Sequence, residues 1–295
     1  MPGDLGRLIP PFEKSSFVVI EAPMKRGKTF AMCDWAVRSM LAGYNTMFFS
    51  LEMILSEMGM RFYQNILGEC MVRRDMVDAD YEITKTIELP FFDKDGEIDV
   101  RIQERKGLTK SHVVDIMSSL KERTKGAEIR YFCEPSYSVN TSIIESRILS
   151  EYKRTGFFPT VLVIDYMDVM APEKGTYKDS KRDRTNMTWL MTRALSQKYG
   201  FLVIAGTQGS RATIKKDIEE DDASEDIRKN AHVVRKIGIN KGVAPGEDPD
   251  EILRKYANRY NVIVDRHHDC DEEKHVRVLK QLDIARPYVD SRRCE

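Results

Sequence analysis

The sequence lacks any apolar run that approaches the roughly 20 residues of a membrane-spanning helix, and no secretory leader precedes the first apolar stretch at residues 17–20. It also lacks a Cys-x-x-Cys pair. Its five cysteines are odd in number, which argues against a disulfide framework or a structural zinc site and favours reduced thiols. We therefore expect a soluble protein of the cytoplasm, or of the host cytoplasm if the protein is viral.

A net charge is also missing, because 47 lysines and arginines balance 47 aspartates and glutamates. Any binding to nucleic acid must then come from local basic patches, and the overall charge neither supports nor excludes it. His267, His268 and Cys270 lie close enough in the sequence to suggest a metal site, but the aspartates among them favour a solvated turn. At 295 residues the chain is long enough for one large α/β domain or two small ones.

A phosphate-binding loop is the strongest motif that is present. It lies between a strand candidate and a helical pattern, and it reads Ala22-Pro23-Met24-Lys25-Arg26-Gly27-Lys28-Thr29. This order is that of a Walker A motif, in which backbone N–H groups at a helix N-terminus surround a polyphosphate. Lys28 fits the lysine that reaches the β- and γ-phosphates, and Thr29 fits the hydroxyl that binds Mg²⁺. Ala22 replaces the first glycine of the usual pattern.

Three polar residues each follow an apolar strand candidate: Glu52 after 46–50, Asp165 at the end of 160–164, and Gln208 after 201–205. Because open α/β sheets bind ligands at the carboxyl ends of their strands, we expect these side chains to meet Lys28 and Thr29. Taken alone, Glu52 could be an ordinary surface glutamate and Gln208 an ordinary loop amide.

Together these residues suffice for hydrolysis of Mg²⁺-ATP. Asp165 fits the Walker B carboxylate that holds the metal with Thr29. Glu52 is the candidate that orients and deprotonates the attacking water, and Gln208 is the candidate that senses the γ-phosphate. We therefore predict ATP and Mg²⁺ as the ligands of this site.

The remaining pattern alternates strands and helices. Helices are expected at 56–67, 141–154 and 187–198, and strands at 129–133, 233–239, 262–264 and 276–282. This predicts an α/β fold with a mostly parallel, twisted sheet flanked by helices, to which the last two strands add an antiparallel hairpin. We expect residues 1–16 to be an N-terminal linker and 17–295 to be one domain. Its charged insertion at about 69–126 would hold helices near 71–87 and 109–124 around a turn at 93–96, or a hairpin.

Three stretches resemble the C-terminal RecA-like ATPase domain of DnaB-family replicative helicases, including those of bacteriophages. They are Phe-Phe-Ser-Leu-Glu-Met at 48–53, Leu-Val-Ile-Asp-Tyr-Met-Asp-Val-Met at 162–170, and Val-Ile-Ala-Gly-Thr-Gln at 203–208. Residues 223–234 also resemble the Ser-rich turn and following strand of that family, although His232 replaces an aspartate. The resemblance covers residues 3–70 and 129–285. It implies a RecA-like P-loop NTPase core in a six-membered ring, with ATP between subunits, single-stranded DNA in the channel, and primase or other replication proteins as partners.

The resemblance also implies a residue that acts across the subunit boundary. In the family, a Lys-Asn-Arg-type sequence near the end of the domain reaches the neighbour's γ-phosphate. The matching positions are Arg266, His267 and His268. Arg266 is permanently charged and can serve as the finger, but His268 is only partly charged at neutral pH, so trans-activation is expected to be weaker. An ordinary surface arginine is the alternative.

Two basic loops are the candidates for DNA contact, because the loops after the Walker B strand and after the sensor strand face the channel in the family. The first carries Lys174, Lys178, Lys181, Arg182 and Arg184, and the second carries Arg211, Lys215 and Lys216. A solvated charged loop is the alternative for each. Phosphate contacts from these loops would make DNA binding salt-dependent and largely independent of sequence.

Two classes of function follow. The first is an ATP-dependent replicative DNA helicase or translocase motor, either part of a longer protein or a minimal stand-alone motor. The second is a RecA-like ATP-dependent switch or loading factor that binds partners without unwinding DNA. A recombinase filament is a third possibility, but the Ser-Leu-Glu-Met stretch favours the helicase family.

Overall fold

The computed structural model describes residues 3–70, 83–107, 109, 114, 120–210, 213, 216–219, 227–246, 250–268 and 274–294. Its centre is a nine-stranded sheet with the order β11-β10-β9-β8-β1-β7-β6-β2-β5. The strands are β1 (Phe17–Ala22), β2 (Thr46–Ser50), β5 (Ile129–Cys133), β6 (Val161–Asp165), β7 (Leu202–Gln208), β8 (Arg235–Lys241), β9 (Ala257–Asp265), β10 (Val276–Gln281) and β11 (Arg286–Arg293). The six strands from β8 to β5 in this order are parallel, and β9, β10 and β11 extend the sheet in antiparallel fashion. The predicted α/β fold class is confirmed.

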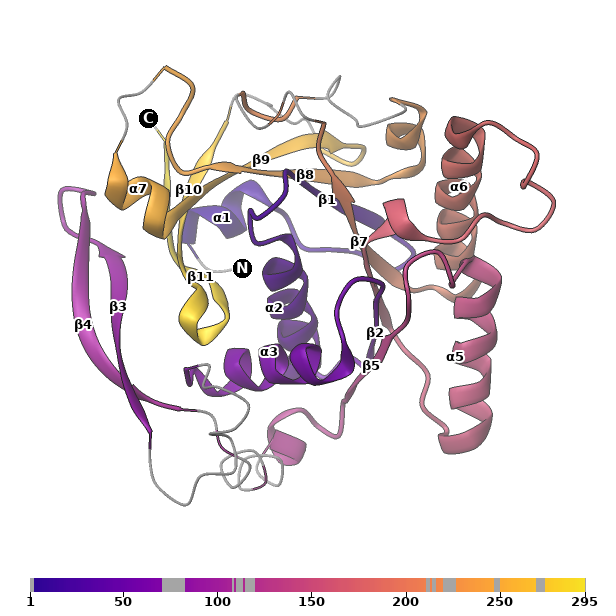
Figure 1. Ribbon diagram of the computed structural model, residues 1–295, viewed down its shortest axis with the longest axis horizontal. Coiled ribbons are helices and arrows are strands. Elements are labelled where there is room, and N and C mark those ends of the chain that lie inside the picture. The colour runs from indigo at the N-terminus through magenta and orange to yellow at the C-terminus, as the bar shows by residue number, and fades with distance from the viewer. Residues whose placement is uncertain are drawn as a thin grey trace.

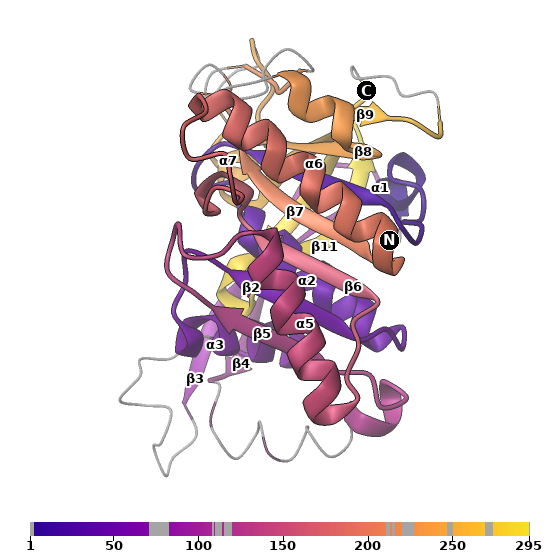
Figure 2. The same ribbon diagram turned by 90° about the vertical axis from the view of Figure 1, so that its right-hand side faces the viewer.

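Helices cover both faces of the sheet (Figures 1 and 2). One face carries α2 (Lys28–Leu41) and α3 (Leu55–Leu67), and the other carries α5 (Thr141–Thr155) and α6 (Lys181–Tyr199). The buried strands supply both hydrophobic cores, because successive side chains of a strand point to opposite faces. In β1, Val18 and Ile20 belong to the core under α2, whereas Phe17 and Val19 belong to the core with Trp189 of α6.

Local signals explain where the helices begin. Asn140 caps α5 by accepting a hydrogen bond from the backbone N–H of Ile143. Ser180 caps α6 in the same way through the N–H of Asp183. The helix therefore begins at Lys181, six residues before the predicted start at 187. As a result, Arg182 and Arg184 lie in the first turn of a helix and not in a loop.

The charged insertion differs from its main prediction. Residues 84–87, expected in a helix, belong to β3 (Thr84–Phe92), which pairs in antiparallel register with β4 (Ile98–Lys106) in a separate two-stranded sheet. The turn predicted at 93–96 is present and joins these strands, because Asp93 Oδ1 accepts the N–H groups of Asp95, Gly96 and Glu97. Most of the helix expected at 109–124 lies outside the described residues, as do residues 71–82 of the other.

The two ends of the chain meet on the antiparallel side of the sheet. Helix α1 (Gly3–Leu8) packs on β11, where the N–H of Leu5 donates to Ser291 Oγ at 3.1 Å. The hairpin β3–β4 lies beside β10 and β11, next to the short helix α7 (Glu251–Tyr256) (Figure 1). Of these elements, the sequence analysis predicted β10, as a strand at 276–282, and gave the hairpin as its alternative for the insertion.

Candidate functional site

The phosphate loop joins β1 to α2 at the carboxyl edge of the parallel strands. Lys25 and Gly27 adopt left-handed backbone conformations, with φ of 61° and 83°. Alternation of such residues turns successive N–H groups to one side, which forms a concave anion-binding surface. Asn258 of β9 supports the loop from behind, because its Nδ2 donates to the carbonyl of Arg26 at 3.0 Å.

A cavity of about 600 Å³ opens over this loop. It is lined by residues 22–30, Glu52, Met53, Glu57, Arg61, Tyr166, Gln208 and Leu282. Strands β1, β7, β6 and β2 are neighbours in the sheet, so the loop, Gln208, Asp165 and Glu52 follow one another along its edge. The structure thus brings together the predicted loop, Glu52 and Gln208, with Asp165 beneath them.

Asp165 is a buried carboxylate that lacks well-formed hydrogen bonds. Burial raises its pKa, while the nearby Lys28 ammonium and Thr29 hydroxyl act in the opposite direction. Neither of its oxygens accepts a well-formed hydrogen bond from any residue in the described ranges. A buried carboxylate without partners is costly, and oxygen ligands of this kind are those that Mg²⁺ prefers. The residues therefore fit a site where Asp165 and Thr29 hold a magnesium ion beside bound phosphates.

Lys28 lies between several acids and an aromatic ring. Its Nζ is 4.0 Å from the centroid of the Tyr166 ring. Burial lowers the pKa of Lys28, and the charges of Asp165, Asp168 and Glu52 oppose that effect. A Cβ at Gly206 would lie 3.1 Å from Lys28 Cδ, so the glycine in β7 leaves room for the lysine chain. Lys28 thus lines the cavity over the loop.

Gln208 is held by a residue that the sequence analysis did not single out. Asp168 accepts the backbone N–H of Gln208 at 2.7 Å and the hydroxyl of Thr207 at 2.9 and 3.0 Å. It also accepts from Nζ of Lys229, which is 2% exposed, at 3.2 Å. Asp168 lies within the motif at 162–170, which was a signal, but nothing in the sequence places Lys229 there. Asp168 and Lys229 thus connect β7, which ends at Gln208, to the 3₁₀ turn at Ile227–His232.

Other residues of the cavity were also missed. Arg61 of α3 lies over the Phe30 ring at 4.3 Å, and its charge favours the ionised form of Asp165. Arg61 belongs to α3, the helix that follows the Ser-Leu-Glu-Met stretch. The sequence signal for Arg61 was its position four residues after Glu57, on the same face of this helix. Leu282 comes from the turn after β10 and had no signal in the sequence.

Arg266 lies at the opposite edge of the sheet. Strand β9 runs antiparallel to β8 and pairs Asp265 with Arg235, so its end is far from the phosphate loop of the same chain. The Arg266 guanidinium donates to the carbonyls of Val233 and Ala231, both at 2.7 Å. His268 Nδ1 is 3.4 Å from Asp265 Oδ2. Action on a neighbouring subunit therefore stays a prediction.

Of the cations predicted to contact DNA, Arg182, Arg184 and Lys216 lie in the described ranges. Arg182 is exposed and Arg184 is half-buried at the start of α6, whereas Lys216 forms an ion pair with Glu219 at 3.1 Å. Arg211 and Lys215 lie outside the described residues. The DNA-binding role of all five stays a prediction.

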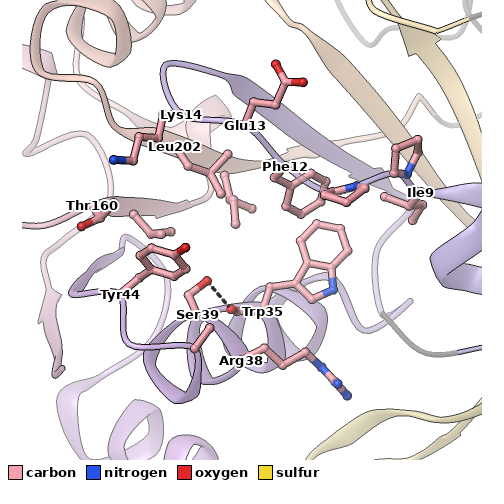
Figure 3. A pocket seen from close by; sticks show the side chains of 15 residues that line it. Ile9, Phe12, Glu13, Lys14, Trp35, Arg38, Ser39, Tyr44, Thr160 and Leu202 are labelled. Carbon is pink, nitrogen blue, oxygen red and sulfur yellow. Dashed lines mark hydrogen bonds between the residues drawn. The ribbon is translucent and has the colours of Figure 1, made fainter. Parts of the chain in front are cut away.

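A second cavity, of about 280 Å³, lies at the other ends of the parallel strands (Figure 3). Phe12, Trp35 and Leu202 line it, and the rings of Phe12 and Trp35 are 5.2 Å apart. The charged ends of Glu13, Lys14 and Arg38 point away from its centre (Figure 3). It is mainly apolar and contains none of the predicted site residues.

Two negative findings concern the described ranges alone. None of the helices there combines the length and apolar character needed to cross a membrane. Within them, no group of three or more His, Cys, Asp or Glu side chains is arranged to hold a metal ion, and Cys270 lies outside them.

The fold has counterparts among solved structures. No protein-family model and no curated protein sequence matches the chain. A DnaB-like replicative helicase, described with its interactions with primase, superposes with a TM-score of 0.68 at 15% identity over 96% of this chain. This chain spans 60% of that protein. The ATPase domain of a phage helicase gives a TM-score of 0.69 at 15% identity, over 96% of this chain and 87% of that one. The chain therefore has the RecA-like fold of helicase ATPase domains, as its motifs predicted.

Proposed function

We propose that this chain is the ATPase motor of a ring-forming replicative DNA helicase or translocase. The observation that carries the proposal is the meeting, in one cavity, of a phosphate loop with Glu52 and Gln208 above the buried Asp165. These residues come from four neighbouring strands, so the sheet itself fixes their relative positions. ATP hydrolysed between subunits, single-stranded DNA in the channel, and primase or other replication proteins as partners belong to this proposal.

The residues of the chain have distinct tasks in hydrolysis. Backbone N–H groups of the phosphate loop and the Lys28 ammonium balance the charge of the β- and γ-phosphates. Glu52 orients the attacking water and accepts its proton, and Gln208 detects whether the γ-phosphate is present. Thr29 and Asp165 would hold Mg²⁺, which supplies charge neutralisation at the phosphate oxygens.

The test compares two substitutions in the same cavity. Lys28→Ala should abolish tight triphosphate binding, whereas Glu52→Gln should retain binding and lose about 10²-fold or more of the hydrolysis rate. ATP binding and turnover are measured with and without single-stranded DNA, with Glu104→Gln on the exposed face of β4 as the matched glutamate control. Equal loss of binding in both variants would remove Glu52 from catalysis.

The ATP-dependent switch or loading factor is the second candidate. It is favoured by the hydrogen bonds of Arg266 to carbonyls of its own chain and by the pairing of His268 with Asp265. Both contacts restrain groups that a motor would use in trans. Nucleotide-dependent partner binding, with turnover that single-stranded DNA does not stimulate, would support this second function.

A further inference from the structure

A separate cavity of about 410 Å³ lies on the β8 side of the phosphate loop. Four cationic residues line it, and each comes from a different segment: Arg26 from the phosphate loop, Lys216 from the connection after β7, Lys241 from the end of β8, and Arg254 from α7. Because β8 is parallel to β1 and next to it, this cavity opens at the same sheet edge as the nucleotide site. Arg26 lines both cavities.

The charges of this basic cavity are poorly compensated. Among the described residues its lining contains one acid, Asp217, which is occupied by Arg259 in a two-point ion pair with N···O distances of 2.9 and 2.5 Å. Lys216 is paired with Glu219. In the ranges that the structure describes, Lys241 and Arg254 have no carboxylate within ion-pair distance. A bound anion would lower the electrostatic energy of this group of cations.

Arg26 adds to the same argument. Its Nε is buried and has no hydrogen-bond partner among the described residues, and burial lowers the pKa of its guanidinium. Lys280 is also buried, and its burial and the charge of Arg26 lower the pKa of Lys280 to about 8. Positive charge therefore accumulates on this side of the loop, where it would attract an anion.

The residue types of the lining favour a phosphate group over a base. Its other described members besides Asp217 are Gly242, Val243, Ala244, Pro245 and Gly246, so the described part of the lining offers no aromatic ring on which a base could stack. The loop packs closely on α7, because a Cβ at Gly242 would lie 2.3 Å from the carbonyl oxygen of Leu253. That contact fixes one wall of the cavity beside Arg254.

We propose that this basic cavity binds a phosphate of a nucleic-acid backbone and thereby connects the bound strand to the nucleotide loop through Arg26. The inference rests on the proposed function, since it requires single-stranded DNA at this edge of the sheet. A strand held by Lys241 and Arg254 contacts the same arginine that borders the ATP cavity. Its presence therefore changes the electrostatic environment of the phosphate loop, and recognition is independent of base sequence.

The experiment uses Lys241→Gln/Arg254→Gln in the full chain. Binding of a fluorescent oligo-dT is measured by anisotropy over a series of salt concentrations, in the presence of a non-hydrolysable ATP analogue. Loss of the two cations that hold this phosphate should weaken binding about tenfold and reduce the slope of log K against log salt by about 0.7. The stimulation of ATPase activity by DNA should also fall. Lys94→Gln/Lys153→Gln removes the same charge from two exposed positions outside the cavity and is the matched control.

The outcomes separate the inference from the proposed function. Wild-type protein that fails to bind oligo-dT would contradict the proposed function itself. Wild-type binding with an unchanged slope and unchanged stimulation in the cavity variant would overturn the inference alone. Inorganic pyrophosphate is the second probe. If it binds the wild type in a manner that depends on Lys241 and Arg254 while oligo-dT does not, the cavity takes a free phosphate and not a strand. Thermal unfolding of both double variants confirms that they are folded.

Discussion

Asp168 shows how one carboxylate can determine the position of a candidate site residue, Gln208. Its oxygens hold the N–H of Gln208 and the hydroxyl of Thr207, and they also pair with the buried ammonium of Lys229. A buried pair of this kind is costly to form and more costly to break on one side, so it stabilises one arrangement over others. The position of Gln208 thus depends on a lysine from a different part of the chain, and only the folded structure reveals this.

Lys280 is the residue whose charge should be visible in the pH dependence of stability. It donates to Asn258 Oδ1 at 2.7 Å, and its pKa is lowered from 10.5 to about 8 by burial and by Arg26. Between these two values the unfolded chain binds more protons than the folded chain, so stability should rise with pH across this window. Below about pH 8 Lys280 is charged in the folded chain, so the full cost of burying that charge lowers the stability.

Lys280→Met removes this titration. The variant should be more stable than the wild type near pH 7 by about 2 kcal/mol, and the difference should shrink towards pH 10.5 because the wild-type lysine becomes neutral. Urea unfolding of both proteins between pH 6.5 and 10.5 measures it. A difference that is constant over this range would show that Lys280 keeps its ordinary pKa.

For the hairpin β3–β4 the main prediction, a helix that includes residues 84–87, was wrong, and the hairpin that was the stated alternative is present. Residues 98–103 alternate apolar and polar side chains, and Asp95-Gly96 precedes them, which together form a strong hairpin signal. The high charge of the surrounding segment directed the interpretation towards helices. The start of α6 was missed for a similar reason, because Ser180 and Asp183 form a capping pattern within a stretch that looked like a basic loop.

The six parallel strands, by contrast, were predicted with bounds that lie within three residues of the observed ones. In β1, β2, β6 and β7 the strand is a largely apolar run followed by a polar motif, and such runs are typical of strands buried on both faces. The residues at their ends were predicted to meet because parallel strands present the same edge. Arg61, Leu282 and Lys229 could not be placed by that argument, since they come from a helix and turns whose docking depends on tertiary packing.

The hairpin should be attached to the core through a small number of contacts. Its buried residue Ile87 packs with Cys70 and Ile284, and Glu88 accepts from Lys255 and Tyr256. Ile87→Ala should cost about 2 kcal/mol locally. We expect faster proteolysis within residues 84–106, with little change in the main unfolding transition and in ATP binding.

Limited proteolysis followed by mass spectrometry, together with thermal unfolding, checks this. Ile102→Ala in β4, where the side chain is 70% exposed, is the control. A large drop in the main transition for Ile87→Ala would instead show that the hairpin folds cooperatively with the ATPase core.

At the scale of the whole molecule, the candidate groups for hydrolysis lie on opposite edges of one sheet. The phosphate loop is at the carboxyl ends of β1 and β8, while Arg266 follows the end of β9 at the other edge. A single chain cannot bring them together without breaking the sheet. If Arg266 takes part in hydrolysis, it must therefore act on the nucleotide of another copy, as an arginine finger does.

Mixing two inactive proteins tests this arrangement. Lys28→Ala retains Arg266, and Arg266→Ala retains the phosphate loop, so an interface between them can be complete. In a random one-to-one mixture about a quarter of the interfaces in a closed ring combine both intact halves, and we expect a corresponding share of wild-type ATPase activity to return.

The double variant Lys28→Ala/Arg266→Ala, mixed with wild-type protein at the same ratio, controls for dilution of intact subunits. Recovery in the first mixture requires a site shared between subunits. Full activity of Arg266→Ala by itself would show that the hydrogen bonds to Val233 and Ala231 are its whole role, which would favour the switch over the motor.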